Sequence, residues 1–408
     1  MATTQSEEGV RVLICRWFTG CAGVLAALLV VACGGGGTSA SSASLPDGTA
    51  LSPQAALGEL IFRDTSLSAS GRQSCASCHS ADNAHSPANA LAVQPGGALL
   101  ELQGRRSAPS TNYLAFNAAF HFDDDGTPTG GFFWDGRATS LQDQAGRPFL
   151  TDFEMANASK ADVVDKLARA PYAETFKTVF GADIFTRPDD AFDRLTLALQ
   201  QYQREDADFR AFSSKYDEFL RGNTALSAQE LRGLALFNDP GKGNCQAYHP
   251  SGKAADGSFP LFTDFSFDNL GVPRNPAIAR NADPAYFDLG LCEREELSDR
   301  TDLCGAFKVP SLRNVALRKA LFHNGRFATL KEALTFDVQR DTNPDKFYPR
   351  GGDGSVMKFD DLPLAFAANV NTVEAPYNRQ PGDAPALSDA EIDDVIAFLQ
   401  TLSDGYRH

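Results

Sequence analysis

Two short segments of the chain share one pattern of apolar and polar positions. They read LSPQAALGELIF (51–62) and LSAQELRGLALF (226–237), with Leu, Ser, Gln, Gly and Phe at matching places. In each segment a serine stands at a helix N-cap position, and apolar residues follow at helical spacing. Both segments are predicted to form amphipathic helices, and their likeness indicates an internal repeat.

Each repeat unit also closes with a predicted helix. The first unit ends in FDRLTLALQQYQRED (192–206) and the second in LSDAEIDDVIAFLQTL (387–402). In the second, a Ser and a Glu three residues later form a capping-box pattern ahead of the apolar periodicity. These patterns predict two tandem domains, at 51–223 and 224–408.

Strand patterns are few along the chain. The stretches 81–150 and 255–385 are rich in Gly, Pro, Asp and Asn, which favours long ordered loops around a modest set of helices. Loops of that length usually carry function or bind something large. The expected fold class is therefore mainly α, with long ordered loops in both domains.

The N-terminal part has the pattern of a targeting segment. Two arginines precede a short apolar run (21–32), which ends in small residues and is short for a bilayer span. The ending LVVAC resembles a bacterial lipobox, which implies cleavage before Cys33 and lipid on its sulfur; secretion as a soluble protein, with an incidental Cys33, is the alternative. We interpret 1–33 as a signal peptide with a lipobox and 34–50 as a flexible linker, which places the protein in the periplasm, anchored to the membrane by lipid.

Charge and cysteine content narrow the classes of partner and site. The formal net charge is −15, which argues against nucleic acid and favours a basic or neutral partner. Beyond Cys33, five cysteines remain. Export implies an oxidising compartment, so Cys292 and Cys304 are predicted to pair around the charged loop between them.

The segment CASCH (75–79) carries the strongest chemical signal. Two thiols at this spacing can add to the two vinyl groups of a haem, and the adjoining His79 can ligate iron. A structural zinc site would need a second pair of ligands at suitable spacing, and none is present. The following histidine, in an exported chain, disfavours a redox Cys-x-x-Cys. We interpret Cys75, Cys78 and His79 as a c-type haem site.

The segment CQAYH (245–249) stands at the matching place in the second unit. Cys245 can form one thioether bond and His249 can ligate iron, whereas Tyr248 cannot form the second bond. A loop cysteine without a cofactor would be the simpler interpretation of the segment alone. Its place in the repeat, with glycines before it and a proline after it, favours a second haem held by a single thioether.

Three further segments are FFWDGR (132–137), AFKVPSLRNVAL (306–317) and FHNGRFATLKEAL (322–334). They resemble the signature segments of bacterial di-haem cytochrome c peroxidases, a family that includes the MauG and MbnH branches. The resemblance extends over nearly all of 51–403, and some stretches lean toward the MbnH-like side. It implies two tandem cytochrome c-like haem domains, the first peroxidatic and the second for electron transfer.

The resemblance also implies roles for individual residues. In the family, the Trp of the FWDGR motif lies between the two haems, which is here Trp134. Ten, fourteen and twenty residues further on, the family places a Gln, a Pro and a Glu around the peroxide pocket, and this chain has Gln144, Pro148 and Glu154. A solvated Gln, a turn Pro and a surface Glu would explain each of them singly.

These residue types suit peroxide chemistry. A carboxylate beside an open iron face can move a proton between the two peroxide oxygens, a role that contributes about 10²–10⁴-fold. Glu154 is thus the proposed acid–base, Gln144 a hydrogen-bonding group for a bound oxygen ligand, and Pro148 a limit on what else approaches. His79 is the proximal ligand, and Trp134 is an electron relay.

The first site departs from simpler members of the family. They carry a distal His sixteen residues after the first haem's His, where this chain has Pro95. The first haem is therefore expected to be open without reductive activation, as the MauG-like branch implies. His85 and His121 could still approach the iron, but surface or loop-packing histidines are favoured.

The second site departs further. Fourteen residues after the His of FHNG the family supplies a distal Met or Tyr, where this chain has Asp337. A carboxylate is an uncommon haem ligand, so Asp337 is a possible distal ligand of a weakly ligated or aquo iron, with Met357 as a less favoured alternative. Calcium is left open, because Ser107 stands where the family's calcium site uses Asn.

The function expected is that of a di-haem c-type oxidoreductase, which reduces hydrogen peroxide with electrons from a small redox protein. The close alternative is MauG/MbnH-like oxidation of a side chain in a partner protein, driven by peroxide. An alternative of another class is a non-catalytic electron-transfer or haem-binding protein whose second haem site has decayed.

Overall fold

The computed structural model describes residues 50–407. The predicted signal peptide, its lipobox and all but the last residue of the predicted linker lie outside the described residues. Within 50–407, no helix is both long enough and apolar enough to cross a bilayer.

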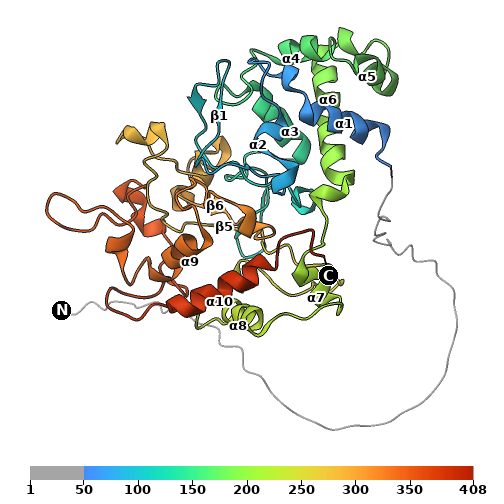
Figure 1. Ribbon diagram of the computed structural model, residues 1–408. Helices are drawn as coiled ribbons and strands as arrows, with labels where there is room; N and C mark the ends of the chain where they lie inside the picture. Colours follow the sequence, from blue (N-terminus) through green and yellow to red (C-terminus); the bar gives the residue numbers. More distant parts are fainter. Residues whose placement is uncertain (1–49, 408) are drawn as a thin grey trace, which may run out of the picture. The chain divides into compact units, whose positions relative to one another are not determined.

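The N-terminal half is built from helices joined by long loops (Figure 1). Its helices are α1 (Pro53–Arg63), α2 (Cys75–Cys78), α3 (Leu141–Leu150), α4 (Lys160–Leu167), α5 (Ala173–Phe180), α6 (Pro188–Glu205) and α7 (Lys215–Leu220). Two antiparallel pairs of two-residue strands lie in the loop region: β1 (Pro95–Gly96) with β2 (Leu102–Gln103), and β3 (His121–Phe122) with β4 (Pro128–Thr129).

The C-terminal half has fewer helices and more irregular chain. Its helices are α8 (Ala228–Asn238), α9 (Leu330–Gln339) and α10 (Asp389–Gln400), and one antiparallel pair joins β5 (Phe267–Asp268) to β6 (Phe307–Lys308). The described chain is thus helical with a few short strands, which confirms the mainly α character that was expected, while two tandem cytochrome c-like haem domains stay a prediction. The capping box predicted before the last helix forms: Ser388 Oγ accepts from the Glu391 N–H, and the Glu391 carboxylate accepts from the Ser388 N–H.

The predicted repeat appears as two equivalent helix crossings. In the first, α1 packs on α6, and a Cβ placed on Gly58 would lie 2.0 Å from the carbonyl oxygen of Ala198. In the second, α8 packs on α10, and a Cβ placed on Gly233 would lie 2.0 Å from the carbonyl oxygen of Asp394. The glycine shared by the two segments is therefore required by the close approach of the closing helix.

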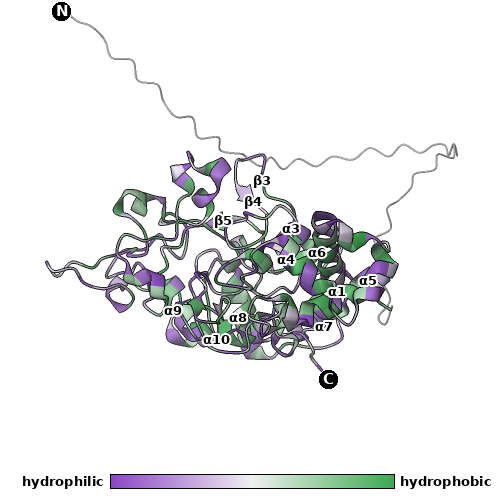
Figure 2. Ribbon diagram, turned by 90° about the horizontal axis from the view of Figure 1, so that it is seen from above, coloured by the Kyte–Doolittle hydropathy of each residue, from purple (hydrophilic) through white to green (hydrophobic). Residues whose placement is uncertain are grey.

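Each half has its own apolar core. Figure 2 shows apolar residues, in green, on helices of both halves. Residues 57–209 supply one large cluster, and residues 216–402 supply the other. Cys75 packs against the first cluster and Cys245 against the second. The two cysteine–histidine segments therefore occupy corresponding positions against separate cores. The boundary between 51–223 and 224–408 as independent domains stays a prediction.

Backbone contacts join the loops of the two halves. The Lys308 N–H in β6 donates to the Trp134 carbonyl at 2.8 Å, and the Ser107 N–H donates to the His323 carbonyl at 2.7 Å. These two hydrogen bonds fix the segments carrying Ser107 and Trp134 against the C-terminal half.

Within the C-terminal half, Cys292 and Cys304 form a disulfide, which confirms the predicted pairing.

Candidate active site

All ten residues that the sequence singled out as site residues line one cavity of about 760 Å³. They are Cys75, Cys78, His79, Trp134, Gln144, Pro148, Glu154, Cys245, His249 and Asp337. Both halves of the described chain contribute walls. The structure thus brings together residues spread over more than 250 positions, while their individual roles stay predictions.

The first cysteine–histidine segment holds its histidine in one orientation. Cys75–Cys78 form a single helical turn that His79 ends. His79 Nδ1 lies 3.2 Å from the His85 carbonyl oxygen, which can only accept, so Nδ1 carries the proton and Nε2 the lone pair. Burial lowers the pKa of His79 to about 4, so the ring is neutral at pH 7 and suited to bind a metal.

The second segment repeats this arrangement. Cys245–Ala247 form a short turn, and His249 Nδ1 lies 2.7 Å from the Phe262 carbonyl oxygen. Burial lowers the pKa of His249 to about 4 as well. Tyr248, which replaces the second cysteine, lines the cavity and donates its hydroxyl to the exposed Glu374 carboxylate at 2.6 Å. The histidine is retained here with the same orientation, although one anchoring thiol is absent.

Helix α3 presents Gln144 and Pro148 to the cavity from one face, since they are four residues apart. Pro148 has no N–H, so the Gln144 carbonyl lacks its usual partner within the helix. Glu154 follows in a turn where its N–H donates to the Thr151 carbonyl at 2.9 Å. Desolvation raises the pKa of Glu154, although the Thr151 hydroxyl and the Arg137 charge oppose this.

The turn that carries Glu154 packs against the end of strand β1. The Gly97 N–H donates to the Glu154 carbonyl at 2.7 Å, and a Cβ on Gly96 would lie 2.2 Å from the Phe153 carbonyl oxygen. Glycine is therefore needed for this approach. Pro95, which stands where simpler members of the resembled family carry a distal His, also lines the cavity and offers no side-chain ligand.

Trp134 is fixed where the two halves meet. Its indole Nε1 donates to the Ser107 carbonyl at 2.8 Å, and its own carbonyl accepts from Lys308 in the C-terminal half. The next residue, Asp135, is buried and accepts from Arg106 and Arg137. The indole can therefore rotate little, as a relay of fixed geometry requires.

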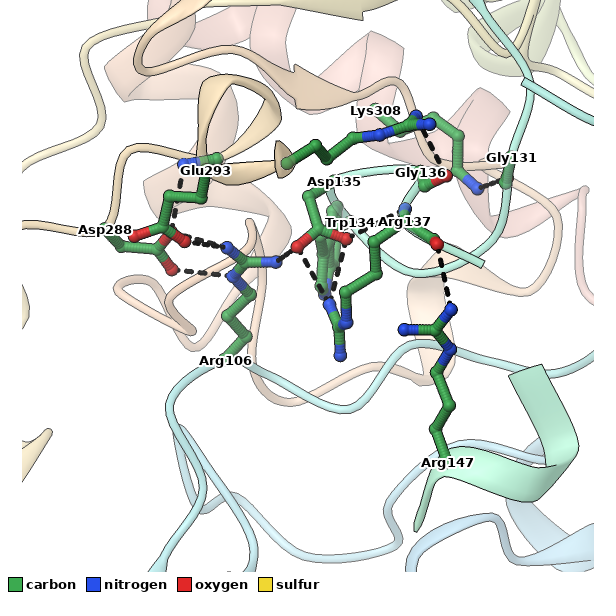
Figure 3. A network of polar contacts seen from close by, with 12 residues as sticks. Arg106, Gly131, Trp134, Asp135, Gly136, Arg137, Arg147, Asp288, Glu293 and Lys308 are labelled. Carbon is green, nitrogen blue, oxygen red and sulfur yellow. Dashed lines mark hydrogen bonds and ion pairs between the residues drawn. The ribbon is translucent and has the colours of Figure 1, made fainter. Parts of the chain in front are cut away.

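Figure 3 shows a polar network in which Arg106 is joined to Asp135, the residue after Trp134, and to Asp288 and Glu293. Its guanidinium contacts Asp135 at 2.5 Å in the N-terminal half, and Asp288 at 2.6 Å and Glu293 at 3.1 Å in the C-terminal half. Neighbouring Arg106 charge lowers the pKa of both Asp135 and Asp288 despite their burial. The network keeps both carboxylates ionised and joins the two halves beside the indole.

The alternatives weighed for the iron ligands lie elsewhere. His85 is 2 % exposed, stacks on Phe209 at 3.9 Å and does not line the cavity, which agrees with the packing interpretation. His121 is exposed and pairs with Asp123. Met357 is 50 % exposed and also does not line the cavity. Of the weighed distal candidates for the second site, Asp337 alone faces the cavity.

The histidines and cysteines that face the cavity fit haem c. Two histidines with their Nδ1 protons bound to backbone carbonyls, and three cysteines that make no disulfide, face a cavity with apolar walls. Among the described residues, no group of three His, Cys, Asp or Glu side chains converges as a site for a bare metal ion. Single histidines beside thiols suit haem iron rather than zinc.

Comparison with known proteins gives the same result. Residues 52–225 match the family model described as di-haem cytochrome c peroxidase. The chain is 35 % identical over 361 residues to methylamine utilization protein MauG of Paracoccus denitrificans, covering 86 % of this chain and 88 % of that protein. This protein belongs to the di-haem cytochrome c peroxidase family.

Other relatives of this family member include peroxidases. It is 32 % identical to cytochrome c551 peroxidase of Nitrosomonas europaea, over 72 % of this chain and 76 % of that one. The crystal structure of the diheme peroxidase BthA from Burkholderia thailandensis superposes with a TM-score of 0.81 at 40 % identity, covering 87 % of each chain. As a member of the family, the protein is a haem-dependent oxidoreductase with haem c as its cofactor.

The structure of this di-haem peroxidase family member adds a partner for Asp337. Asp337 lies on α9, and Tyr377 donates its hydroxyl to Asp337 Oδ1 at 3.2 Å. Burial raises the pKa of Asp337 to about 7, although the Tyr377 hydrogen bond and the Arg340 charge lower it. Tyr377 is 9 % exposed and lines the cavity.

Sequence reasoning missed several cavity residues. Tyr377 lies 128 residues beyond His249 in a loop that no motif identifies. Arg318 stands directly after the AFKVPSLRNVAL segment and beside Lys319, and no sequence signal distinguishes the two cations. Neither could be assigned to the site before the chain was folded.

Proposed function

We propose that the protein reduces hydrogen peroxide at the site formed by His79, Gln144, Pro148 and Glu154, with electrons from a small redox protein. The observation that carries the proposal is the convergence of these side chains, from α2, α3 and the turn after α3, on one cavity. The relatives include proteins named cytochrome c peroxidase. The balance is one peroxide, two electrons and two protons giving two water molecules.

Cys75, Cys78 and His79 would hold the first haem, whose iron supplies the redox chemistry that cleaves the peroxide O–O bond. Glu154 takes the proton from one peroxide oxygen and returns it to the other, which leaves as water. Desolvation raises the Glu154 pKa, which makes the carboxylate a better proton acceptor than a solvated one. Gln144 donates its side-chain amide to the peroxide, and Pro148 restricts the space beside it.

Trp134 is the proposed path for electrons between the two centres. Its indole is held by Ser107, while its backbone is held by Lys308. Fixed contacts on both sides keep the indole in one position, so little reorganisation accompanies transfer. The network around Arg106 places compensated charges beside the indole.

The second haem would be held by His249 and by one thioether bond to Cys245. Asp337 is the proposed distal group, with Tyr377 positioning its carboxylate. Burial raises the pKa of Asp337 to about 7, so its carboxyl would have to lose a proton before it could serve as a ligand of this haem. We expect this centre to be weakly ligated and to differ in redox potential from the first.

Oxidation of a side chain in a partner protein, driven by peroxide, is the second candidate. It is favoured by the 35 % identity to a MauG protein over 86 % of this chain. Export to the periplasm and a lipid anchor on Cys33 complete the proposal, and calcium binding is left open. Mass spectrometry of the mature N-terminus tests the anchor, and metal analysis tests the calcium.

Addition of peroxide to the purified ferric protein tests the peroxidase function. A rapid change in the haem absorption spectrum, followed by turnover with a reduced small cytochrome, is the expected result. A spectral change without turnover would favour the partner-oxidation candidate. No spectral change would contradict both and leave the non-catalytic alternative. Intact mass, with a pyridine haemochrome spectrum, counts the haems beforehand.

A further inference from the structure

Arg318 is a cationic cavity residue that the mechanism above does not use. It follows a short helical turn at Val315–Leu317 in the C-terminal half, yet it lines the same cavity as Cys75, Cys78 and His79. The C-terminal half therefore contributes a positive charge to the cavity that the first cysteine–histidine segment lines.

The guanidinium of Arg318 is held on one side and unpartnered on the other. Nη2 donates to Ser107 Oγ at 3.2 Å, to the Ala108 carbonyl at 3.0 Å and to the Ala320 carbonyl at 3.1 Å. Nη1 is buried and has no hydrogen-bond partner among the described residues. Three neutral oxygens thus orient the group without neutralising it.

The other cavity-lining arginines differ from Arg318. Arg106 pairs with Asp288, Arg137 with Asp135 and Arg313 with Asp217. Arg105 is exposed to solvent. Burial alone accounts for the lowered pKa of Arg318, about 10, so no carboxylate of the described chain supports its charge.

Burying a guanidinium without a charged partner costs free energy unless an anion binds to it. A carboxylate matches the planar donor geometry of the guanidinium. We propose that Arg318 binds a propionate carboxylate of the haem held by Cys75, Cys78 and His79. The cofactor brings that carboxylate to the cavity, and Nη1 is the free donor that meets it. The inference rests on the haem of the proposed function and is independent of its peroxide chemistry.

This contact would link the carboxylate to Trp134. Ser107 accepts from Arg318 through its hydroxyl and from the Trp134 indole through its carbonyl. One residue therefore holds both the positioning guanidinium and the relay. In this arrangement Arg318 is a positioning residue, and it completes the first haem site from the other half of the chain.

The test compares Arg318→Gln and Arg318→Lys with the wild-type holoprotein by redox titration and resonance Raman spectroscopy. Removing a fixed positive charge favours the ferric state, so Arg318→Gln should lower the midpoint potential of the first haem. It should also shift the Raman bending mode of that haem's propionate. Arg318→Lys should give smaller changes in the same direction, and it serves alone if the Gln variant does not fold.

Arg326→Gln is the matched control, because Arg326 also has an unpartnered nitrogen but does not line the cavity. It should leave both readouts unchanged, and the redox step of the second haem, identified by its response to Asp337→Asn, should not move with Arg318. An unchanged potential and Raman mode in the Arg318 variants would overturn the inference. So would a wild-type potential that depends on added acetate at constant ionic strength, since a free anion would then occupy Nη1.

Discussion

The two cysteine–histidine centres share a helix crossing and a histidine orientation, but they differ in the residues that lie around the histidine. Both place a glycine-bearing helix under a closing helix, and both hold a histidine Nδ1 on a backbone carbonyl. The first keeps two thiols, and Gln144, Pro148 and Glu154 converge on the shared cavity with it. The second has Tyr248 in place of a thiol, and Asp337 as its distal candidate. The close helix crossings are thus alike in the two halves, while the residues beside the two histidines differ.

This difference suggests that the two centres are under different chemical demands. A site that cleaves peroxide needs a proton carrier at a defined position. Glu154 is the residue proposed for that role, and its carbonyl accepts a hydrogen bond from the Gly97 N–H. A site that only stores or passes an electron needs a ring and a proximal ligand. Tyr248 and Asp337 are compatible with the second demand.

The largest expected effect concerns Glu154, the proposed acid–base group of the first centre. Glu154→Gln should slow the spectral change after peroxide addition by about 10²–10⁴-fold, because the amide cannot carry the proton. Stopped-flow absorbance measures the rate. Asp152→Asn, an exposed change in the same turn, is the control and should have no effect. An unchanged rate in the Glu154 variant would remove its assigned role.

The pH dependence of the same rate sharpens this assignment. Protonated Glu154 cannot accept the peroxide proton, so the rate should fall as pH drops through its pKa. Desolvation raises that pKa, so the fall should begin above the ordinary Glu value of about 4.3. Rates measured from pH 4 to 8 should show this inflection in the wild type and lack it in Glu154→Gln. The same inflection in both proteins would assign it to another group.

The next prediction tests the scaffold that the two halves share. Gly58→Ala and Gly233→Ala should each destabilise the protein by about 1–3 kcal/mol, since each Cβ would meet a carbonyl oxygen of the closing helix. Urea unfolding of each variant gives the change in free energy. Gly252→Ala is the control, because nothing lies within 4 Å of its Cβ. Destabilisation of one variant only would mean that the two crossings are not equivalent.

The smallest expected effect concerns the missing anchor. Tyr248→Cys completes a Cys-x-x-Cys-His segment at a position that already lines the cavity. A second thioether removes a vinyl group from conjugation, so the pyridine haemochrome band should move to shorter wavelength. Tyr248→Phe loses the hydroxyl's hydrogen bonds with Glu374 and Asn371 but adds no thiol, and it should leave the band in place. No shift in the cysteine variant would mean that position 248 does not face a vinyl group.

Much of the fold could be predicted because helix signals are local. The serine caps and apolar spacing of 51–62 and 226–237 predicted α1 and α8, and the capping box at Ser388 predicted the start of α10. The disulfide between Cys292 and Cys304 was predicted from the oxidising compartment that export implies and from the number of cysteines beyond Cys33. The short strands were not predicted, since two-residue pairings have no period to detect.

The sequence by itself determined the family and the candidate site residues, since CASCH, FFWDGR and their spacings need no tertiary contact to be recognised. Only the tertiary structure decided what surrounds them. Tyr377 reaches Asp337 from a loop, and Arg318 reaches the shared cavity from the second half of the chain. Motifs are written in consecutive residues, whereas the charge and hydrogen bonding of a cavity depend on segments that only folding brings together.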